Sequence, residues 1–304
     1  MKFVDIKNDI AFRKIFGNEN RKEVLISFLN AILLLEDNRK IVDVDILTPY
    51  QLPALKGGKV TIVDIKAKDQ NDKNYIVEMQ VAEVDGFDKR VLYYASKSYS
   101  SQIDRGDLYE QLNPTFFIGI LDFEISKNPN YISRNKILDV ETGENLISDI
   151  EFNFIELPKF NQQETELTTI IDQWVYFIKN AENLDIIPES VKDAGLKYAY
   201  EDADKHNWTK AELDAYDYVL MREQDDRGRI TFATRKAVKE AVKEAVEKAV
   251  EKAVIEKQQA VVEALVKEKE AIALNLLSLG LSLEDTAKGT GLSVEQVEKL
   301  RAEK

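Results

Sequence analysis

The sequence from residue 60 runs Val60-Thr-Ile-Val-Asp64-Ile-Lys66-Ala-Lys68, and after a polar cluster it continues Tyr75-Ile-Val-Glu78-Met79-Gln80-Val81. Both runs are rich in β-branched residues, which favour extended strands. The cluster between them, Asp69-Gln-Asn-Asp-Lys-Asn74, contains residues typical of tight turns. We therefore expect the two runs to form a β-hairpin.

Acidic and polar side chains recur on both expected strands. Because successive side chains of a strand point to opposite faces, Asp64 and Lys66 share one face, and Glu78 and Gln80 share one. If the two faces coincide, two carboxylates and two other polar groups meet at one edge of a sheet. Such an arrangement can hold Mg²⁺, which binds one or two carboxylates together with water and substrate phosphates. The pattern favours metal-assisted cleavage of phosphodiesters; the alternative is a hairpin with polar residues on its solvent face.

Composition limits the class of protein. The 304 residues are 44% hydrophobic and 32% charged, which is typical of a soluble protein with more than one structural unit. Cysteine is absent, which excludes disulfides, zinc-thiolate sites and cysteine nucleophiles and fits a reducing cytoplasm. The sequence shows no signal-peptide run, no stretch of transmembrane length and no GxxxxGK(S/T) phosphate loop. We expect a cytoplasmic protein with no membrane partner and no nucleotide cofactor.

The net charge of -13 argues at first against a nucleic-acid partner. The charge is unevenly distributed, because residues 111–234 carry a net charge of -12 and residues 1–110 only -1. The acidity therefore lies away from the hairpin. A neutral region is still not basic, so DNA binding must use local Lys and Arg side chains or a metal ion rather than a broad positive field.

The expected elements suggest three regions. Helices are expected after Asn8-Asp9 and over about 21–35, followed by a strand near 41–47, the hairpin, a helix over 87–103 and strands at 115–121, 131–140 and 150–157. Beyond Pro158 the pattern is helical. We expect a first domain over 1–158, an acidic helical region over 159–234 and a helical tail over 235–304.

The tail contains a low-complexity array over residues 237–254, in which Ala-Val-Lys-Glu occurs twice and Ala-Val-Glu-Lys follows twice. These residues favour a helix, but a four-residue repeat drifts by about 40° per repeat, which argues against a long left-handed coiled coil. Two short helices are expected around Gly289-Thr-Gly291, in a pattern like a helix-turn-helix. The second of them lacks a positive excess, so packing or self-association as a homodimer is favoured over DNA reading.

Several motifs follow one another in order: Asp9-Ile-Ala-Phe-Arg-Lys-Ile-Phe-Gly17, Leu25-Ile-Ser-Phe-Leu-Asn-Ala-Ile32, Val63-Asp-Ile-Lys-Ala-Lys68, Val77-Glu-Met-Gln-Val81 and Lys89-Arg-Val-Leu-Tyr-Tyr94. Together they resemble the PD-(D/E)XK nuclease family of transposases, also described as recombination-promoting nucleases. The resemblance covers roughly residues 5–125 closely and extends to the helical tail.

The resemblance implies an α/β fold with a restriction-endonuclease-like αβββαβ core. In such a core a mixed sheet is flanked by helices, and here a helical C-terminal region would follow. It also implies that Asp64 and Glu78 bind Mg²⁺, with Mn²⁺ as a substitute, and that the backbone carbonyl of Met79 completes the metal site. Asp9 matches an acidic position of the family and would be a further metal ligand, or otherwise a helix cap.

Gln80 stands where the wider family signature has Lys, although Glu-x-Gln recurs in this group. Gln can only hydrogen-bond, so the metal must do more to lower the pKa of the attacking water. Lys66 would supply the missing positive charge, or it is an ordinary solvated lysine. Lys89 and Arg90 begin a helix that lies near the substrate phosphates in nucleases of this architecture, and solvated surface cations are the alternative.

The expected function is therefore that of a Mg²⁺-dependent DNA endonuclease linked to recombination, mobile elements or genome defence. The rival interpretation is a catalytically weak or inactive protein of the same fold that binds DNA or protein through its helical tail. A buried ion pair at the acidic site, such as Glu78 with Lys66, would favour the rival.

Overall fold

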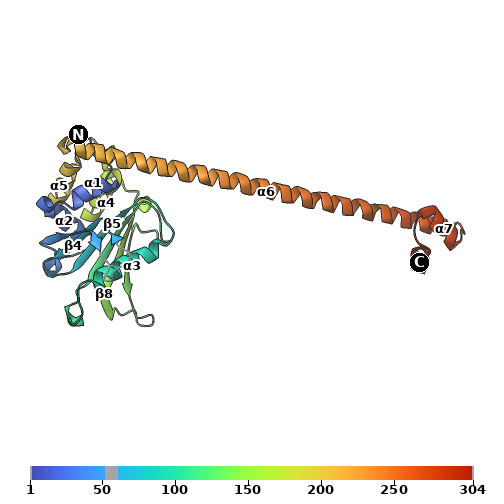
Figure 1. Cartoon of the computed structure of the whole chain (residues 1–304), viewed down its shortest axis with the longest axis horizontal. Helices are drawn as coiled ribbons and strands as arrows, with labels where there is room; N and C mark the ends of the chain where they lie inside the picture. Colours follow the sequence, from blue (N-terminus) through green and yellow to red (C-terminus); the bar gives the residue numbers. More distant parts are fainter. Residues whose placement is uncertain (1, 52–60, 303–304) are drawn as a thin grey trace. The chain divides into compact units, whose positions relative to one another are not determined.

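A mixed six-stranded sheet forms the centre of the fold (Figure 1). The computed structural model describes residues 2–51 and 61–302. Across the sheet the strands are ordered β1 (Val44–Leu47), β4 (Ile65–Asp69), β5 (Asn74–Gln80), β6 (Thr115–Leu121), β8 (Ile147–Glu156) and β7 (Ile132–Ile137). A separate two-stranded sheet pairs β2 (Tyr50–Gln51) with β3 (Thr61–Ile62).

The predicted hairpin is confirmed as β4 and β5, which pair antiparallel with Ile65 opposite Val77. Val60, the first residue of the quoted run, lies outside the described residues. On its other edge β5 pairs parallel with β6, which places Glu78 opposite Gly119. A Cβ atom on residue 119 would lie 2.9 Å from the Phe154 ring, so a glycine is required at this point of the sheet.

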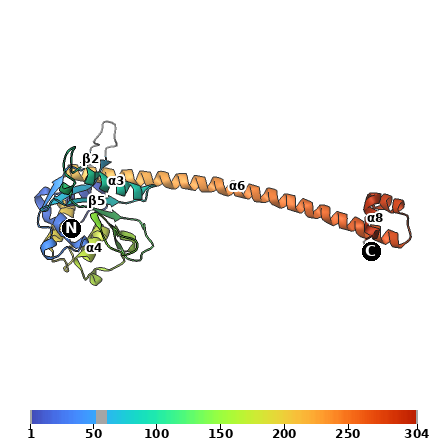
Figure 2. The ribbon, with the colours of Figure 1, turned by 90° about the horizontal axis from the view of Figure 1, so that it is seen from below.

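Helices cover both faces of the sheet (Figure 2). One face packs against α1 (Asp9–Phe16), α2 (Lys22–Ile32), α4 (Ile170–Asn180) and α5 (Ala194–Ala203). The other face packs against α3 (Phe87–Ser100). The side chains of β5 alternate between these layers, since Val77 belongs to the larger core and Ile76 to the core under α3.

The start and end of α1 follow from two local residues. Asn8 caps the helix, and its side-chain oxygen accepts hydrogen bonds from the backbone N–H groups of Ile10 and Ala11. Gly17 ends the helix, and a Cβ atom there would lie 2.6 Å from the carbonyl oxygen of Arg13. The cap role that was weighed for Asp9 therefore belongs to its neighbour Asn8.

Aromatic side chains join the helices into one core. Trp174 of α4 packs edge-on against Phe28 and Phe177, with ring centroids 5.6 and 5.9 Å apart, and its indole N–H donates to Ser27. Because α4 and α5 share this core with the sheet, the first compact unit extends over residues 1–223. It thus runs past Pro158, where the sequence suggested a boundary.

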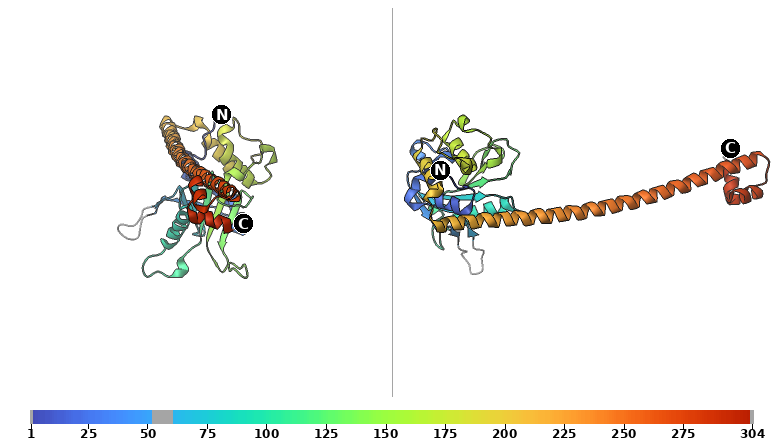
Figure 3. Two further views of the ribbon diagram at one scale, coloured as in Figure 1. Left: turned by 90° about the vertical axis from the view of Figure 1, so that its right-hand side faces the viewer. Right: turned by 90° about the horizontal axis from the view of Figure 1, so that it is seen from above.

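The second compact unit covers residues 224–304. Helix α6 (Lys210–Ser278, 69 residues) begins in the first unit, continues into the second and is one unbroken helix (Figure 3). It is followed by α7 (Leu283–Thr290) and α8 (Val294–Ala302). One residue of each of these three helices is buried (Ala273, Ala287 and Val297), and the predicted helical C-terminal region is confirmed. No helix in the described part of the chain combines the length and apolar character needed to cross a membrane.

Candidate active site

Two buried carboxylates lie side by side where β4 begins. Asp64 occupies a bend just before β4, and Glu78 lies near the end of β5. The backbone N–H of Asp64 donates to Glu78 Oε1 (3.1 Å), and the backbone N–H of Met79 donates to Asp64 Oδ2 (2.9 Å). The exposed fractions of Asp64 and Glu78 are 9% and 5%. The hairpin therefore brings the two predicted metal ligands together and fixes one oxygen of each.

The second oxygen of Asp64 is paired with Arg13 of α1. Arg13 Nη2 lies 2.7 Å from Asp64 Oδ1, and Nε donates to the same oxygen at 3.1 Å. The Arg13 side chain remains 45% exposed, whereas that of Asp64 is 7% exposed. The ion pair thus joins a buried anion to a cation that solvent can reach.

Gln80 links Glu78 to a second arginine. The Gln80 side-chain N–H₂ donates to Glu78 Oε2 (2.9 Å), and its carbonyl oxygen accepts from Arg90 of α3. The guanidinium carbon of Arg90 lies 5.7 Å from the centre of the Phe87 ring and 6.0 Å from that of Tyr94. An amide can join a carboxylate to a guanidinium because it both donates and accepts, whereas a lysine at position 80 would donate to Glu78 and repel Arg90.

Burial and mutual repulsion dominate the electrostatics of the site. Burial raises the pKa of Glu78, and the charge of Asp64 raises it further; the Asp64 N–H, Arg90 and Arg13 oppose the shift. Asp9, one turn before Arg13, is exposed, yet crowding by protein atoms and the Asp64 charge raise its pKa. Arg222, near the start of α6, acts on Asp9 in the opposite direction. The three carboxyl groups of the site, Asp9, Asp64 and Glu78, therefore outnumber the two arginines, Arg13 and Arg90, that lie closest to the acidic pair.

No hydrogen bond or ion pair joins Lys66 to Asp64 or Glu78 in the described residues. Lys66 is half-buried in a recess that Lys68, Ser98 and Gln102 also line, and burial and Lys68 lower its pKa. Within residues 2–51 and 61–302 it forms no ion pair. Lys66 lies opposite Ile76 in the strand register, two residues before Glu78, so it faces the same side of the sheet as Glu78, whereas Asp64 lies in a bend before the strand begins. Lys89 is exposed and, within the same ranges, also lacks an ion pair.

The carboxylate pair fits a divalent cation. Two buried carboxylates that repel each other are what Mg²⁺ or Mn²⁺ would stabilise, and both ions prefer oxygen ligands. Among the described residues, no group of three or more Asp, Glu or His side chains is arranged to hold a metal ion. Asp64 and Glu78 would thus hold the ion together with water. The further roles foreseen for the Met79 carbonyl and for Asp9 stay predictions.

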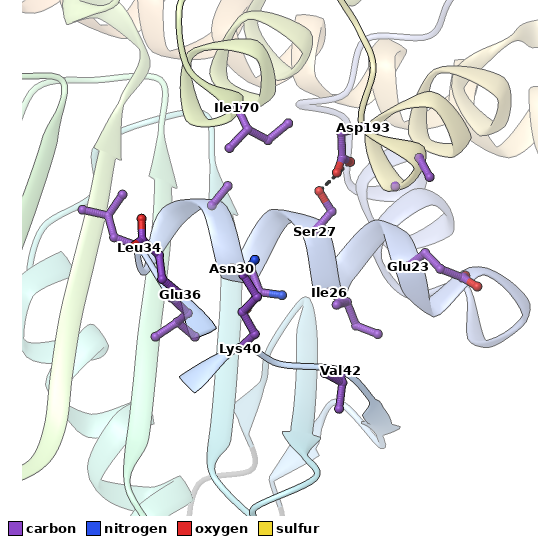
Figure 4. A pocket seen from close by; sticks show the side chains of 14 residues that line it. Glu23, Ile26, Ser27, Asn30, Leu34, Glu36, Lys40, Val42, Ile170 and Asp193 are labelled. Atoms are coloured by element: carbon purple, nitrogen blue, oxygen red, sulfur yellow. Dashed lines mark hydrogen bonds between the residues drawn. The ribbon is translucent and has the colours of Figure 1, made fainter. Parts of the chain in front are cut away.

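A recess elsewhere on the first unit, of about 540 Å³, lies beside α2 (Figure 4). Several of its polar side chains hold the surrounding elements together: Ser27 donates to Asp193 Oδ1 (2.6 Å), and Asn30 exchanges hydrogen bonds with the backbone of Ile41 (2.8 and 2.9 Å). Glu23, Glu36 and Lys40 also line the recess, and both glutamates are exposed. The recess therefore holds no buried pair of carboxylates like Asp64 and Glu78 among its lining residues.

Arg13 is the functional candidate that sequence reasoning missed. It lies in the first quoted motif, four residues after Asp9, and the i, i+4 spacing places both side chains on one helix face. That spacing was the only signal available, because the contact with Asp64 spans 51 residues. His206 pairs with Asp204 (2.8 Å) and lies apart from the residues described above.

The mixed sheet, its flanking helices and the acidic pair on the central hairpin define a nuclease-like α/β fold of the restriction-endonuclease-like architecture. The chain belongs to the PD-(D/E)XK nuclease family of transposases, whose family model matches residues 6–233. No curated protein and no solved structure shows significant similarity to the chain.

Proposed function

We propose that the protein is a metal-dependent endonuclease that hydrolyses DNA phosphodiesters. The observation that carries the proposal is the joined pair of buried carboxylates, Asp64 and Glu78, in a chain of a nuclease family. Bound Mg²⁺ or Mn²⁺ would activate a water molecule and stabilise the charge of the leaving oxygen. Asp64 and Glu78 would hold that ion.

The other residues of the site would bind and orient. Arg90 lies beside the carboxylates, and its planar guanidinium suits a bidentate contact with a phosphate of the substrate. Gln80 holds the Glu78 carboxylate by one oxygen and leaves the other on the Asp64 side. Arg13 neutralises Asp64, and its exposed side chain is free to turn toward a phosphate once Asp64 has another cation.

Two observations favour a second candidate, a catalytically weak member of the family. The Arg13–Asp64 ion pair occupies one of the oxygens that a metal ion needs, although the pair differs from the Glu78–Lys66 pair weighed in the sequence analysis. Gln80 also brings no positive charge to the attacking water. In this case the chain would act as a DNA- or protein-binding module through its helical tail.

We further propose a role in recombination, mobile elements or genome defence, which membership of a nuclease family of transposases supports. A homodimer formed through the C-terminal helices would supply two active sites for two DNA strands. Helix α8 carries Glu295 and Glu298 beside Lys299 and Arg301, a balance that suits packing better than a phosphate-rich groove.

Plasmid cleavage by the purified full chain tests the proposal. Wild type is compared with Asp64→Asn and Glu78→Gln in Mg²⁺, in Mn²⁺ and in EDTA, because these substitutions remove charge with little change in shape. Asp72→Asn, an exposed acid in the hairpin turn, is the matched control. Cleavage that needs metal, persists in the control and falls at least a hundredfold in both site variants supports the nuclease. An uncut plasmid with wild type under every condition would transfer support to the binding module.

A further inference from the structure

A second recess of the first unit, of about 250 Å³, lies where the end of α3 meets β4 and the loop before β6. Lys66 and Lys68 of β4, Asn74 of β5 and Ser98 of α3 are among the residues that line it, and we call it the lysine recess. None of the described residues that line it is acidic. In a chain with a net charge of -13, a recess lined by two cations and no described anion indicates a place for a negatively charged group.

The positive charge of the lysine recess is only partly compensated. Lys66 is half-buried and forms no hydrogen bond or ion pair in the described part of the chain. Lys68 pairs with Asp72 of the hairpin turn at 3.2 Å, and this contact is exposed to solvent. Burial and the charge of Lys68 lower the pKa of Lys66. A bound anion would oppose both effects, because it attracts each ammonium group and replaces the water that burial removes.

Ser98 adds a buried hydroxyl to the two cations. Its side chain is 1% exposed, and within residues 2–51 and 61–302 the hydroxyl has no hydrogen-bond partner. Buried hydroxyls rarely stay unpaired, so this one needs an explanation. A water molecule could satisfy the hydroxyl alone, but it would not offset the charge of the lysines. The wall beside it is fixed, since the Gln102 amide exchanges hydrogen bonds with the backbone of Asn113 (2.8 and 3.0 Å).

The lysine recess lies on the same side of the sheet as Glu78. Lys66 stands opposite Ile76 and Lys68 opposite Asn74, which are two and four residues before Glu78 on β5. At about 3.4 Å per residue, the two lysines are about 7 and 14 Å from the level of Glu78 along the strand. Successive nucleotides of one DNA strand rise about 3.4 Å, so these distances correspond to about two and four nucleotides.

We propose that the lysine recess binds a backbone phosphate of a DNA strand, about two to four nucleotides from the phosphate held at the acidic pair. The ligand and its position rest on the proposed function. Lys66 and Lys68 supply charge, and Ser98 donates a hydrogen bond to a phosphate oxygen. An acidic peptide would suit the same donors, but the shared sheet face with Glu78 favours the substrate strand. The contact touches no base, so it positions the strand without reading its sequence.

DNA binding without metal tests the lysine recess separately from catalysis. Fluorescence anisotropy of a short labelled duplex with the full chain in EDTA, over a range of salt concentrations, gives the affinity and the number of phosphate contacts. Lys66→Gln should weaken binding about tenfold at low salt and lower the magnitude of the salt slope by about 0.9. Lys40→Gln removes the same charge from an exposed lysine beside α2 and should change neither quantity.

Ser98→Ala distinguishes binding from a structural role. The variant deletes a buried hydroxyl that has no partner, so its free energy of unfolding should equal or exceed that of wild type, whereas its DNA affinity should fall about threefold to tenfold. A wild type that binds no DNA would overturn the subsite, as would unchanged affinity in both Lys66→Gln and Ser98→Ala. If the variants weaken binding as expected but wild type cuts no plasmid, only the nuclease is refuted. If wild type cuts and neither variant alters binding, only the subsite is refuted.

Discussion

Replacing Arg13 with glutamine tests the electrostatic account of the acidic site. In wild type Arg13 gives two hydrogen bonds to one oxygen of Asp64, at 2.7 and 3.1 Å. Breaking a fully buried ion pair costs about 3–5 kcal/mol. Because the Arg13 side chain is 45% exposed, solvent already screens part of this interaction, and we expect a loss of about 1.5–3 kcal/mol in the free energy of unfolding without metal.

Urea unfolding followed by tryptophan fluorescence is the appropriate assay. The chain has two tryptophans, Trp174 and Trp208, and both are buried in the first unit, so the signal reports on the unit that contains Arg13. In a thermal scan the same loss corresponds to a fall in Tm of roughly 3–12 °C for a domain of this size. Arg21→Gln is the matched control, since Arg21 pairs with Glu201 and Asp202 at the surface and should cost about 1 kcal/mol or less.

The response to metal decides whether the reasoning is correct. Mn²⁺ and Arg13 compete for the same oxygen of Asp64, so saturating Mn²⁺ should stabilise Arg13→Gln more than wild type and should leave the Arg21→Gln difference unchanged. An Arg13→Gln variant no less stable than the control would refute the stabilising role of the Arg13–Asp64 ion pair, and equal stabilisation of both variants and wild type by Mn²⁺ would refute the competition for Asp64.

Three further predictions follow from contacts at the site. The raised pKa of Glu78 means that the folded state holds this proton more tightly than the unfolded state, so wild type without metal should lose stability as pH rises above the ordinary glutamate range. Glu78→Gln should remove that slope in unfolding curves between pH 5 and 9 (roughly the range spanned by the shift), and an unchanged slope would contradict the assignment. Arg90→Ala should weaken binding of a DNA duplex in EDTA and lower the magnitude of the salt slope by about one, whereas an unaltered slope would remove Arg90 from the phosphate contacts. Gly17→Ala should lower the free energy of unfolding by about 1–3 kcal/mol, because the new Cβ atom meets the Arg13 carbonyl at 2.6 Å; a thermal scan equal to that of wild type would show that α1 can shift at no cost.

Local patterns were enough to predict the hairpin and its acidic pair. The alternation along β5 and the turn residues between Asp69 and Asn74 are properties of adjacent residues, and the structure follows them. The resemblance to the nuclease family then predicted a mixed sheet flanked by helices, and the structure has this arrangement. Alternation also places Lys66, opposite Ile76, on the same side of the sheet as Glu78, but no ion pair joins Lys66 to a carboxylate in the described residues, and its role at the site stays a prediction.

Contacts between distant residues set the limit of prediction. Arg13 meets Asp64 across 51 positions, and no rule of spacing selects it over the many other cations of the chain. The boundary expected at Pro158 illustrates the same point, since Leu157–Lys159 forms only a short 3₁₀ turn and Phe160 and Trp174 beyond it enter the core of the sheet. A proline indicates a local interruption but carries no information about which side chains pack together afterwards.

The link from Glu78 through Gln80 to Arg90 also constrains how this site can evolve. A change of Gln80 to lysine, taken alone, would bring two cations into hydrogen-bond distance on one wall of the site. Loss of Arg90 first would leave the amide oxygen of Gln80 without its hydrogen-bond donor. Each single change therefore leaves one polar group repelled or unpaired, so the effect of a substitution at position 80 is expected to depend on the residue at position 90.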